Sequence, residues 1–399
     1  KEDEIRDRLR SFTRTIPMFI MANDSKEEIT IDNFDLEIDN NDFVELTSIT
    51  KEEFYKLRDG FDYEEDGQRK TFQGVFNKYR FNASIAEFRL KKNELSNYFT
   101  AEEDIFELIP NQKTNQIFTP KKVVQMMINN LEKHDPRLFT QTDSTFIDLY
   151  MKSGMYITEI VKKLFHNTRK HYQSDEDCLK HILENQVYGL APTPILQGIT
   201  QSYIFGFDIE NSIYRNNFVQ HDITPEAKEG KAKEKLQELF NQNENMKFDA
   251  VVGNPPYQEV AKGSSTSDDP IYHFFMNASQ ELADKAVLIT PGRFLFNAGK
   301  TPKKWNNEIL NNLHLKILFY LQKSSEVFSG TDIKGGVVVT LFDKSRVLGP
   351  IGATTSFEEL NSITDKVENS LNFKSIISII ETQNKFNLDE LFKDYPQYK

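Results

Sequence analysis

The chain has 399 residues, of which 38% are hydrophobic and 12% aromatic, and this excludes a disordered protein while allowing two or three domains with a large core. Its net charge of −12 excludes a surface that attracts nucleic acid uniformly, because Lys and Arg supply most of the nonspecific affinity for phosphates. Any basic surface must therefore be local, or must lie on segments outside this chain.

Three further features bear on location and on metals. No run approaches the roughly 18 apolar residues of a membrane helix, and the first 30 residues are too charged for a signal peptide. Cys178 is the only cysteine, which excludes an internal disulfide framework and a multi-thiolate metal site. His181 and His221 lack metal-ligand spacing. We therefore expect a cytoplasmic protein with no metal and no membrane partner.

The first part of the chain, residues 1–97, is acidic and is predicted to be mainly helical. Residues 5–22 predict a helix that Pro17 interrupts or kinks. Thr50–Glu53 and Thr100–Glu103 both fit a capping box that leads into a short apolar run. We predict no catalytic chemistry in this region.

From about residue 111 the pattern changes, because helical periods now alternate with short apolar runs. This alternation is typical of a parallel sheet with crossover helices. The last two apolar runs have no convincing helix between them and predict an antiparallel hairpin at one edge. The fold class is therefore α/β, a doubly wound and mostly parallel sheet behind a mainly helical N-terminal segment. In chain order we expect a helix opened by Thr119 as N-cap and Pro120 as first residue, a strand at 145–150, helices at 155–165 and 175–184, a strand at 186–190, a helix at 194–204, a strand at 218–220, a helix at 226–240, a strand at 248–252, a helix at 271–282, and strands at 286–290, 315–321 and 336–342.

The most specific motif is Asn254-Pro255-Pro256-Tyr257, which directly follows a predicted apolar strand. Ligands bind at the carboxyl ends of strands in open α/β sheets. An adenine amino nitrogen is a poor nucleophile, because its lone pair is delocalised, and two acceptors that take both amino hydrogens would free that lone pair. The Asn254 side-chain oxygen and the Pro255 carbonyl are the candidate acceptors, while the two prolines stiffen the turn. Tyr257 offers a ring for a base extracted from a duplex.

The alternative interpretation of this motif is a proline-stiffened turn without catalysis. This alternative is the weaker one, because four specified residues directly follow a buried strand. The motif is similar to motif IV of the amino-methyltransferases, which reads Asn-Pro-Pro-Tyr in adenine enzymes. The order of the other motifs, over about residues 104–343, resembles that of the gamma-ordered, Eco57I-like restriction-modification methylases. The corresponding segments are 116–120 (motif X), 145–154 (motif I), 187–191 (motif II), 220–223 (motif III), 286–294 (the "TPxRF" segment) and 327–337 (the "VF…IKGGV" element).

The resemblance implies a class I methyltransferase fold and a site-specific enzyme that transfers the methyl group of S-adenosylmethionine to N6 of a flipped adenine in double-stranded DNA. It also implies the cofactor site. Phe118 and Thr119 would contact the methionine end of the cofactor, and Asp148 with the Ser153–Gly154 turn would lie beneath it. The start of the following helix would bring backbone amides to the cofactor carboxylate.

The same resemblance implies that Asp222 accepts a hydrogen bond from the cofactor's adenine and that Ile223 packs against that ring. Two residues depart from the family pattern. Lys152 replaces a glycine that lets the backbone approach the cofactor, and Ala191 stands where an acid usually holds the ribose hydroxyls. We therefore expect weak cofactor binding.

Two further candidates are weaker. Phe328 is a candidate to stack on the flipped adenine, with a core residue as the commoner alternative. A basic group, Lys300, Lys303 and Lys304, would either contact phosphates or form a solvated loop.

We predict three regions: a helical segment (1–97), the catalytic domain (98–345) and the start of a connection to a target-recognition region (346–399). The chain lacks an initial Met, and we interpret it as a fragment whose full-length protein carries upstream nuclease or helicase regions and a downstream recognition region. Two alternatives stay open. One is a methyltransferase acting on RNA or on a glutamine amide, and the other is a cofactor-poor DNA-binding or regulatory module of a restriction nuclease-translocase.

Overall fold

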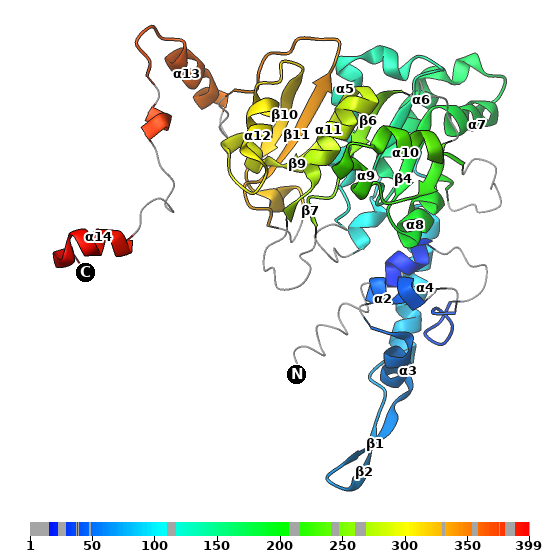
Figure 1. Cartoon of the computed structure of the whole chain (residues 1–399). Coiled ribbons are helices and arrows are strands. Elements are labelled where there is room, and N and C mark those ends of the chain that lie inside the picture. The colour runs from blue at the N-terminus through cyan, green and yellow to red at the C-terminus, as the bar shows by residue number, and fades with distance from the viewer. Residues whose placement is uncertain are drawn as a thin grey trace. The chain divides into compact units, whose positions relative to one another are not determined.

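The computed structural model describes residues 16–22, 29–36, 38, 40–47, 49–109, 117–206, 216–240, 247–259, 269–328, 332–352, 358–374, 376–379 and 388–398. The chain divides into two compact units, Lys1–Gly352 and Ala353–Lys399 (Figure 1). In the described parts of the chain, every helix is too short or too polar to cross a membrane.

Seven strands of the larger unit form one mixed sheet. In spatial order they are β10 (Leu315–Leu321), β11 (Val337–Asp343), β9 (Ala283–Pro291), β6 (Phe248–Gly253), β3 (Phe146–Asp148), β4 (Val187–Ala191) and β5 (Phe218–Gln220). Strand β11 runs antiparallel to both of its neighbours, β9 and β10, whereas β9, β6, β3, β4 and β5 are parallel. This topology is that of the class I methyltransferase fold. The predicted fold class, including the antiparallel edge, is therefore confirmed.

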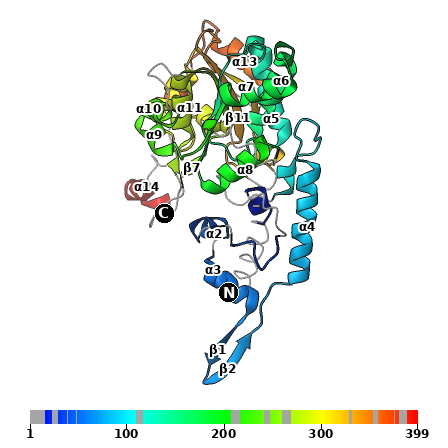
Figure 2. The same ribbon diagram turned by 90° about the vertical axis from the view of Figure 1, so that its right-hand side faces the viewer.

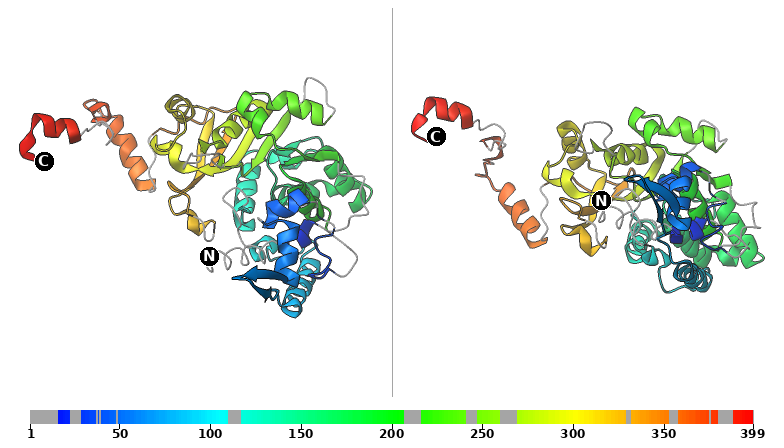
Figure 3. Two further views of the ribbon diagram at one scale, coloured as in Figure 1. Left: turned by 60° about the horizontal axis from the view of Figure 1, so that its bottom comes forward. Right: turned by 90° about the horizontal axis from the view of Figure 1, so that it is seen from below.

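Two hydrophobic clusters cover the two faces of this sheet. Successive strand residues alternate between them: Phe146 belongs to one cluster and Ile147 to the other, as expected for a strand whose side chains point to opposite faces. Each face is covered by its own set of helices, which gives three layers (Figure 3). The first set is α5 (Lys121–His134), α6 (Met155–Thr168), α7 (Asp175–Asn185) and α8 (Pro194–Ile204), and the second is α9 (Thr224–Glu229), α10 (Ala232–Leu239), α11 (Tyr272–Leu282) and α12 (Lys303–Leu310).

Three local predictions are wrong in the larger unit. The single helix expected at 226–240 is divided into α9 and α10, because Gly230 adopts the left-handed conformation at φ +69° and ends α9. Thr119 is not the N-cap of α5; Pro120 holds that position without a side-chain hydrogen bond. The expected capping box at Thr100–Glu103 begins no helix, and a short 3-10 helix (Ile105–Leu108) follows instead, capped by Asp104.

The N-terminal part of the larger unit has its own hydrophobic cluster, built around Phe34, Phe43 and Phe54. Residues 16–22 are helical, whereas residues 5–15 of the predicted helix lie outside the described residues. The Thr50–Glu53 capping box is present as predicted. The helices that follow in this N-terminal part are α2 (Asn40–Thr47), α3 (Lys51–Asp59) and α4 (Lys78–Glu94).

A two-stranded hairpin interrupts this helical region, and the sequence analysis did not predict it. Strands β1 (Phe61–Glu65) and β2 (Gln68–Phe72) pair antiparallel between α3 and α4 (Figure 2). Asp66 and Gly67 form the turn, both with positive φ, as a two-residue hairpin loop requires.

Where the structure describes the smaller unit, its helices are α13 (Glu358–Glu368) and α14 (Leu388–Asp394), with 3-10 turns at Ile376–Ile379 and Pro396–Tyr398.

Candidate active site

The carboxyl edge of the parallel strands gathers the residues that the sequence analysis singled out. Asp148 and Ala191 are the last residues of β3 and β4, Asn254 directly follows β6, and Asp222 lies two residues after β5. Because β6, β3, β4 and β5 are adjacent and parallel, these four residues lie along one edge of the sheet. Segments more than a hundred residues apart in the chain thereby meet in one place.

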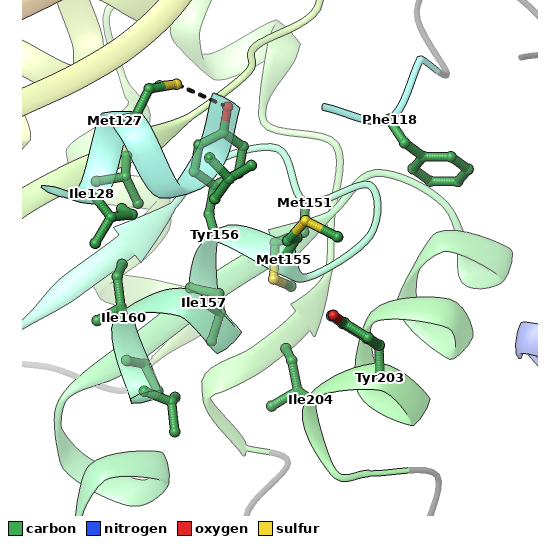
Figure 4. Packing of buried hydrophobic residues seen from close by; sticks show 14 of the residues in the cluster. Phe118, Met127, Ile128, Met151, Met155, Tyr156, Ile157, Ile160, Tyr203 and Ile204 are labelled. Atoms are coloured by element: carbon green, nitrogen blue, oxygen red, sulfur yellow. Dashed lines mark hydrogen bonds between the residues drawn. The ribbon is translucent and has the colours of Figure 1, made fainter. Parts of the chain in front are cut away.

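Asn254 is buried, and its amide has one hydrogen-bond partner among the described residues. The Nδ2 group donates a hydrogen bond to Thr119 Oγ1 at 3.0 Å, across 135 positions of the chain. The Tyr156 hydroxyl lies 3.4 Å from Thr119 Oγ1 and 3.4 Å from the Met127 sulfur, toward which it points in Figure 4. The Oδ1 atom of Asn254 is buried and has no hydrogen-bond partner among the described residues. A buried acceptor without a donor is destabilising, so this atom is suited to a donor that arrives with a ligand.

The rest of the turn is rigid and faces a cavity. Pro255 and Pro256 are buried, and the Tyr257 carbonyl accepts a hydrogen bond from the Ile271 backbone N–H at 3.1 Å. The short strands β7 (Gln258–Glu259) and β8 (Asp269–Pro270) pair beside it. Tyr257 lines a cavity of about 300 Å³. Burial raises the pKa of Tyr257, so its hydroxyl stays neutral.

Asp148 lies in close contact with the strand that carries the Asn-Pro-Pro-Tyr turn. Its Oδ1 accepts a hydrogen bond from the Tyr150 backbone N–H at 3.0 Å, and burial raises the pKa of the carboxyl to about 7. A Cβ atom at Gly253 would lie 2.7 Å from this oxygen. Only glycine therefore lets the ends of β3 and β6 approach so closely.

The loop between β3 and α6 is held by contacts of its own. Gly154, at φ +80°, is the N-cap of α6, and Ser153 Oγ accepts a hydrogen bond from the Met155 N–H at 3.2 Å. The Met151 N–H donates to the Leu190 carbonyl at 2.7 Å. The Met151 side chain fills the space beside Gly189, where a Cβ atom would lie 2.2 Å from its sulfur. The glycine of motif II thus makes room for the motif I loop.

Lys152 points inward rather than into solvent. Its side chain is buried, with Nζ 5.8 Å from the ring centroid of Tyr150 and 6.0 Å from that of Tyr257. Burial lowers the pKa of the ammonium group to about 7, while Asp148 opposes that shift. Lys152 therefore links the motif I loop to the ring of the Asn-Pro-Pro-Tyr turn.

The other predicted cofactor residues differ in exposure. The Phe118 ring is buried and packs against Phe106 at 5.0 Å between centroids. Ile223 is fully buried as the N-cap of α9, and Ala191 is fully buried as well. Asp222 is exposed, and its Oδ1 accepts hydrogen bonds from the backbone and hydroxyl of Thr224. The motif X residue Gln116 lies outside the described residues.

The weaker candidates lie as follows. Phe328 is fully buried in the core cluster and does not line the cavity beside Tyr257, in agreement with the core alternative. Lys300 lines that cavity and forms an ion pair with Asp269 at 2.8 Å. Lys303 and Lys304 are exposed at the start of α12.

The sequence analysis missed Tyr156, Gly253 and the contact of Thr119 with Asn254. A signal existed for Gly253, because a glycine inside a strand marks a close approach of another segment. For Thr119 the local signal was misleading, since a threonine before a proline at a helix start is typical of an N-cap. Its contact with Asn254 depends on tertiary structure alone.

The amino-acid sequence is similar to those of known methylases. Residues 185–328 match the Eco57I restriction-modification methylase family. An uncharacterized adenine-specific methylase of Mycoplasma pneumoniae is 22% identical over 322 residues, which cover 67% of this chain and 74% of the relative.

Solved structures with low identity are also similar. The nuclease-deletion mutant of the Type ISP restriction-modification enzyme LlaGI, solved with a DNA substrate mimic, is 14% identical with a TM-score of 0.42. The match covers 63% of this chain, which spans 25% of the LlaGI chain. A putative class I S-adenosylmethionine-dependent methyltransferase of Listeria monocytogenes is 11% identical with a TM-score of 0.43, over 89% of this chain and 98% of that one.

The sheet has the topology of the class I methyltransferase fold, the Asn254–Tyr257 turn lies at its carboxyl edge, and the proteins that the chain resembles in sequence are restriction-modification and adenine-specific methylases. The predicted resemblance to the Eco57I restriction-modification methylases is therefore confirmed over residues 185–328, the part of the chain that the family model matches.

Proposed function

We propose that this chain transfers a methyl group from S-adenosylmethionine to N6 of an adenine that is flipped out of duplex DNA. The observation that carries the proposal is the buried Asn254 Oδ1, which has no hydrogen-bond partner among the described residues. Thr119 holds the amide so that its nitrogen is occupied and its oxygen is available. An acceptor in this state suits an N–H donor, and an adenine amino group carries two.

The turn prepares the nitrogen of the substrate for attack. Asn254 Oδ1 accepts one amino hydrogen and the Pro255 carbonyl accepts the other, which favours a pyramidal nitrogen with its lone pair directed away from the ring. The base stacks on Tyr257, whose cavity of about 300 Å³ is of the size that small ligands occupy. Because the turn is rigid before the substrate arrives, orientation supplies much of the rate acceleration.

The residues at the carboxyl edge fit the cofactor. Gly154 begins α6 with its backbone N–H groups toward the loop after β3, which is an arrangement that accepts a carboxylate. Asp148 is buried beneath this loop, and Asp222 is exposed at the end of β5 with room for a polar ligand. S-adenosylmethionine supplies an electrophilic methyl group on a sulfonium when it is bound. Lys152 is buried with Nζ near the rings of both Tyr150 and Tyr257, so its side chain lies close to the proposed base site.

Two observations bear on the alternatives. Residues 185–328 match a family of restriction-modification methylases, and restriction-modification systems act on DNA, which favours DNA over RNA or a glutamine amide as the substrate of this chain. A cofactor-poor module would be consistent with Lys152 and Ala191, the two departures from the family pattern. Cofactor affinity separates this second alternative from the enzyme.

Calorimetric titration of the chain with S-adenosylmethionine tests the cofactor site. Without an acid at Ala191, the ribose loses hydrogen bonds worth roughly 1.5–3 kcal/mol each, or about 10- to 100-fold in affinity. We therefore expect saturable binding with a dissociation constant of about tens of micromolar. ATP, which shares the adenosine but lacks the sulfonium and the amino-acid carboxylate, serves as the control and should bind much more weakly. Absence of binding up to millimolar concentrations, or equal binding of ATP, would contradict the proposed enzyme and favour the regulatory module.

A further inference from the structure

The cavity beside Tyr257 is more basic than the rest of the molecule. Its charged lining residues are Arg293, Lys300 and Lys334 against a single acid, Asp332, in a chain whose net charge is −12. Tyr257 and Pro291 form part of the wall, so the cavity opens directly onto the turn that binds the base. A base that enters it brings its own sugar and phosphates to the rim.

Arg293 is held in place by two glycines from different segments. It belongs to the 3-10 helix Gly292–Phe296 that follows β9. A Cβ atom at Gly335 would lie 2.5 Å from Arg293 Cγ, and one at Gly299 would lie 3.4 Å from Arg293 Cβ and Cδ. Both glycines have a positive φ, +85° and +92°, which favours glycine at these positions independently of the available space. The stem of Arg293 is therefore packed between two backbones, which reduces the entropy that its guanidinium loses on binding a ligand.

The backbone around Arg293 is fixed as well. The Gly292 N–H donates to the Gly336 carbonyl at 2.9 Å, which ties the residue before Arg293 to the turn before β11. The Tyr320 hydroxyl donates to the Gly335 carbonyl at 3.3 Å. These contacts join the "TPxRF" and "IKGGV" segments: the first supplies the arginine and the second supplies the glycine against which it packs.

The guanidinium has no hydrogen-bonded or ion-paired partner among the described residues. Lys300, by contrast, is paired with Asp269, and Lys334 is exposed. Arg293 is thus the half-buried cation of this cavity that forms no ion pair with a carboxylate of the described residues. A planar guanidinium binds a phosphate through two parallel hydrogen bonds, which makes arginine well suited to this ligand.

We propose that Arg293 binds a backbone phosphate of the target nucleotide and thereby holds the flipped adenosine in the cavity beside Tyr257. The inference rests on the proposed function and extends it from the base to its phosphodiester. Phosphate contacts fix the register of a nucleic acid on a protein without reading its sequence. Arg293 would accordingly bind the phosphate of the target nucleotide in any recognition sequence.

The test uses an unpaired adenine, which needs neither a recognition sequence nor base flipping. The probes are a short fluorescein-labelled oligodeoxyadenylate and its methylphosphonate analogue, in which the linkages carry no charge. Binding of each probe to the chain is followed by fluorescence anisotropy. We expect the unsubstituted chain to prefer the phosphodiester by about tenfold or more, as a charge-assisted hydrogen bond provides.

Three variants separate the effect of the Arg293 charge from the effect of its packing. Arg293→Met keeps the stem between the glycines and should bind both probes with nearly equal affinity. Arg293→Lys keeps the charge and should retain part of the preference. Arg169→Met removes an arginine that does not line the cavity and should retain all of it. Full preference in Arg293→Met, or an equal loss of affinity for both probes, would overturn the inference, because the phosphate contact would then lie elsewhere or Arg293 would contact only the base.

Methyl transfer to duplex DNA, measured in parallel, distinguishes a failure of the Arg293 phosphate contact from a failure of the proposed function. Methyl transfer by the unsubstituted chain without any preference for the charged probe overturns the role of Arg293 alone. A preference that depends on Arg293 without methyl transfer overturns the proposed function and leaves a phosphate site.

Discussion

Asn254→Ala is expected to lower kcat for methyl transfer by about 100- to 1,000-fold, by analogy with the removal of one positioned hydrogen-bond donor from an oxyanion hole. The Oδ1 atom is buried and lacks a partner among the described residues, so its acceptor capacity is available to the substrate. The measurement is transfer of labelled methyl from S-adenosylmethionine to duplex DNA under single-turnover conditions, where product release does not limit the rate.

Cofactor affinity provides the control for Asn254→Ala, because the Asn254 side chain is proposed to contact the base and not the cofactor. It should remain within a few-fold of that of the unsubstituted chain. Asn311→Ala, at the exposed end of α12, is the matched substitution that should leave turnover unchanged. Unchanged turnover in Asn254→Ala would remove the basis for assigning the turn a catalytic role.

Thr119→Val should lower kcat by about 5- to 100-fold, because it removes the acceptor for Asn254 Nδ2 and leaves a buried donor unpaired at a cost of about 1–3 kcal/mol. Valine has nearly the shape of threonine, so the packing of this buried position is preserved. Thr119→Ser keeps the hydroxyl and should retain most of the activity. The measurement is again single-turnover methyl transfer, with cofactor affinity determined for each variant.

The family resemblance implies a different role for Thr119, namely contact with the methionine end of the cofactor, and the two roles have different signatures. If Thr119 orients Asn254, kcat falls at unchanged cofactor affinity, and Thr119→Val has no further effect in an Asn254→Ala background. If Thr119 acts only through the cofactor, affinity falls at unchanged kcat and the two substitutions are additive. The second pattern would contradict the orientation of the amide by Thr119.

Most strands of the sheet were predictable because they are apolar runs, which are buried in the structure. The three residues of β5 were predicted at 218–220, the bounds found in the structure, and β6 was found from its apolar run and the turn that follows. The hairpin β1–β2 was missed for the opposite reason. All but one of its strand residues are exposed, and β2 shows no alternation of polar and apolar residues. The Asp66–Gly67 pair, typical of a hairpin turn, was the available signal.

The parts of the candidate site that adjoin a strand end were predictable, and the contacts between segments were not. Asp148 and Asn254 follow apolar runs, which places them at the carboxyl edge of any parallel sheet. The partner of Asn254 lies 135 residues away, and the glycine that packs on Arg293 lies in another segment again. Such pairs depend on the spatial order of β3, β6, β9 and β11. The local patterns of a single sequence do not reveal that order.

The central claim, methylation of adenine at N6 in DNA, is tested most directly by the identity of the product. Duplex DNA that lacks methylated bases is incubated with the chain and S-adenosylmethionine carrying a deuterated methyl group, digested to nucleosides and examined by mass spectrometry, with Asn254→Ala as the control. We predict labelled N6-methyladenine that depends on Asn254, and no labelled N4-methylcytosine. Labelled methylcytosine in the DNA, or label that appears only in RNA or protein substrates, would contradict the claim.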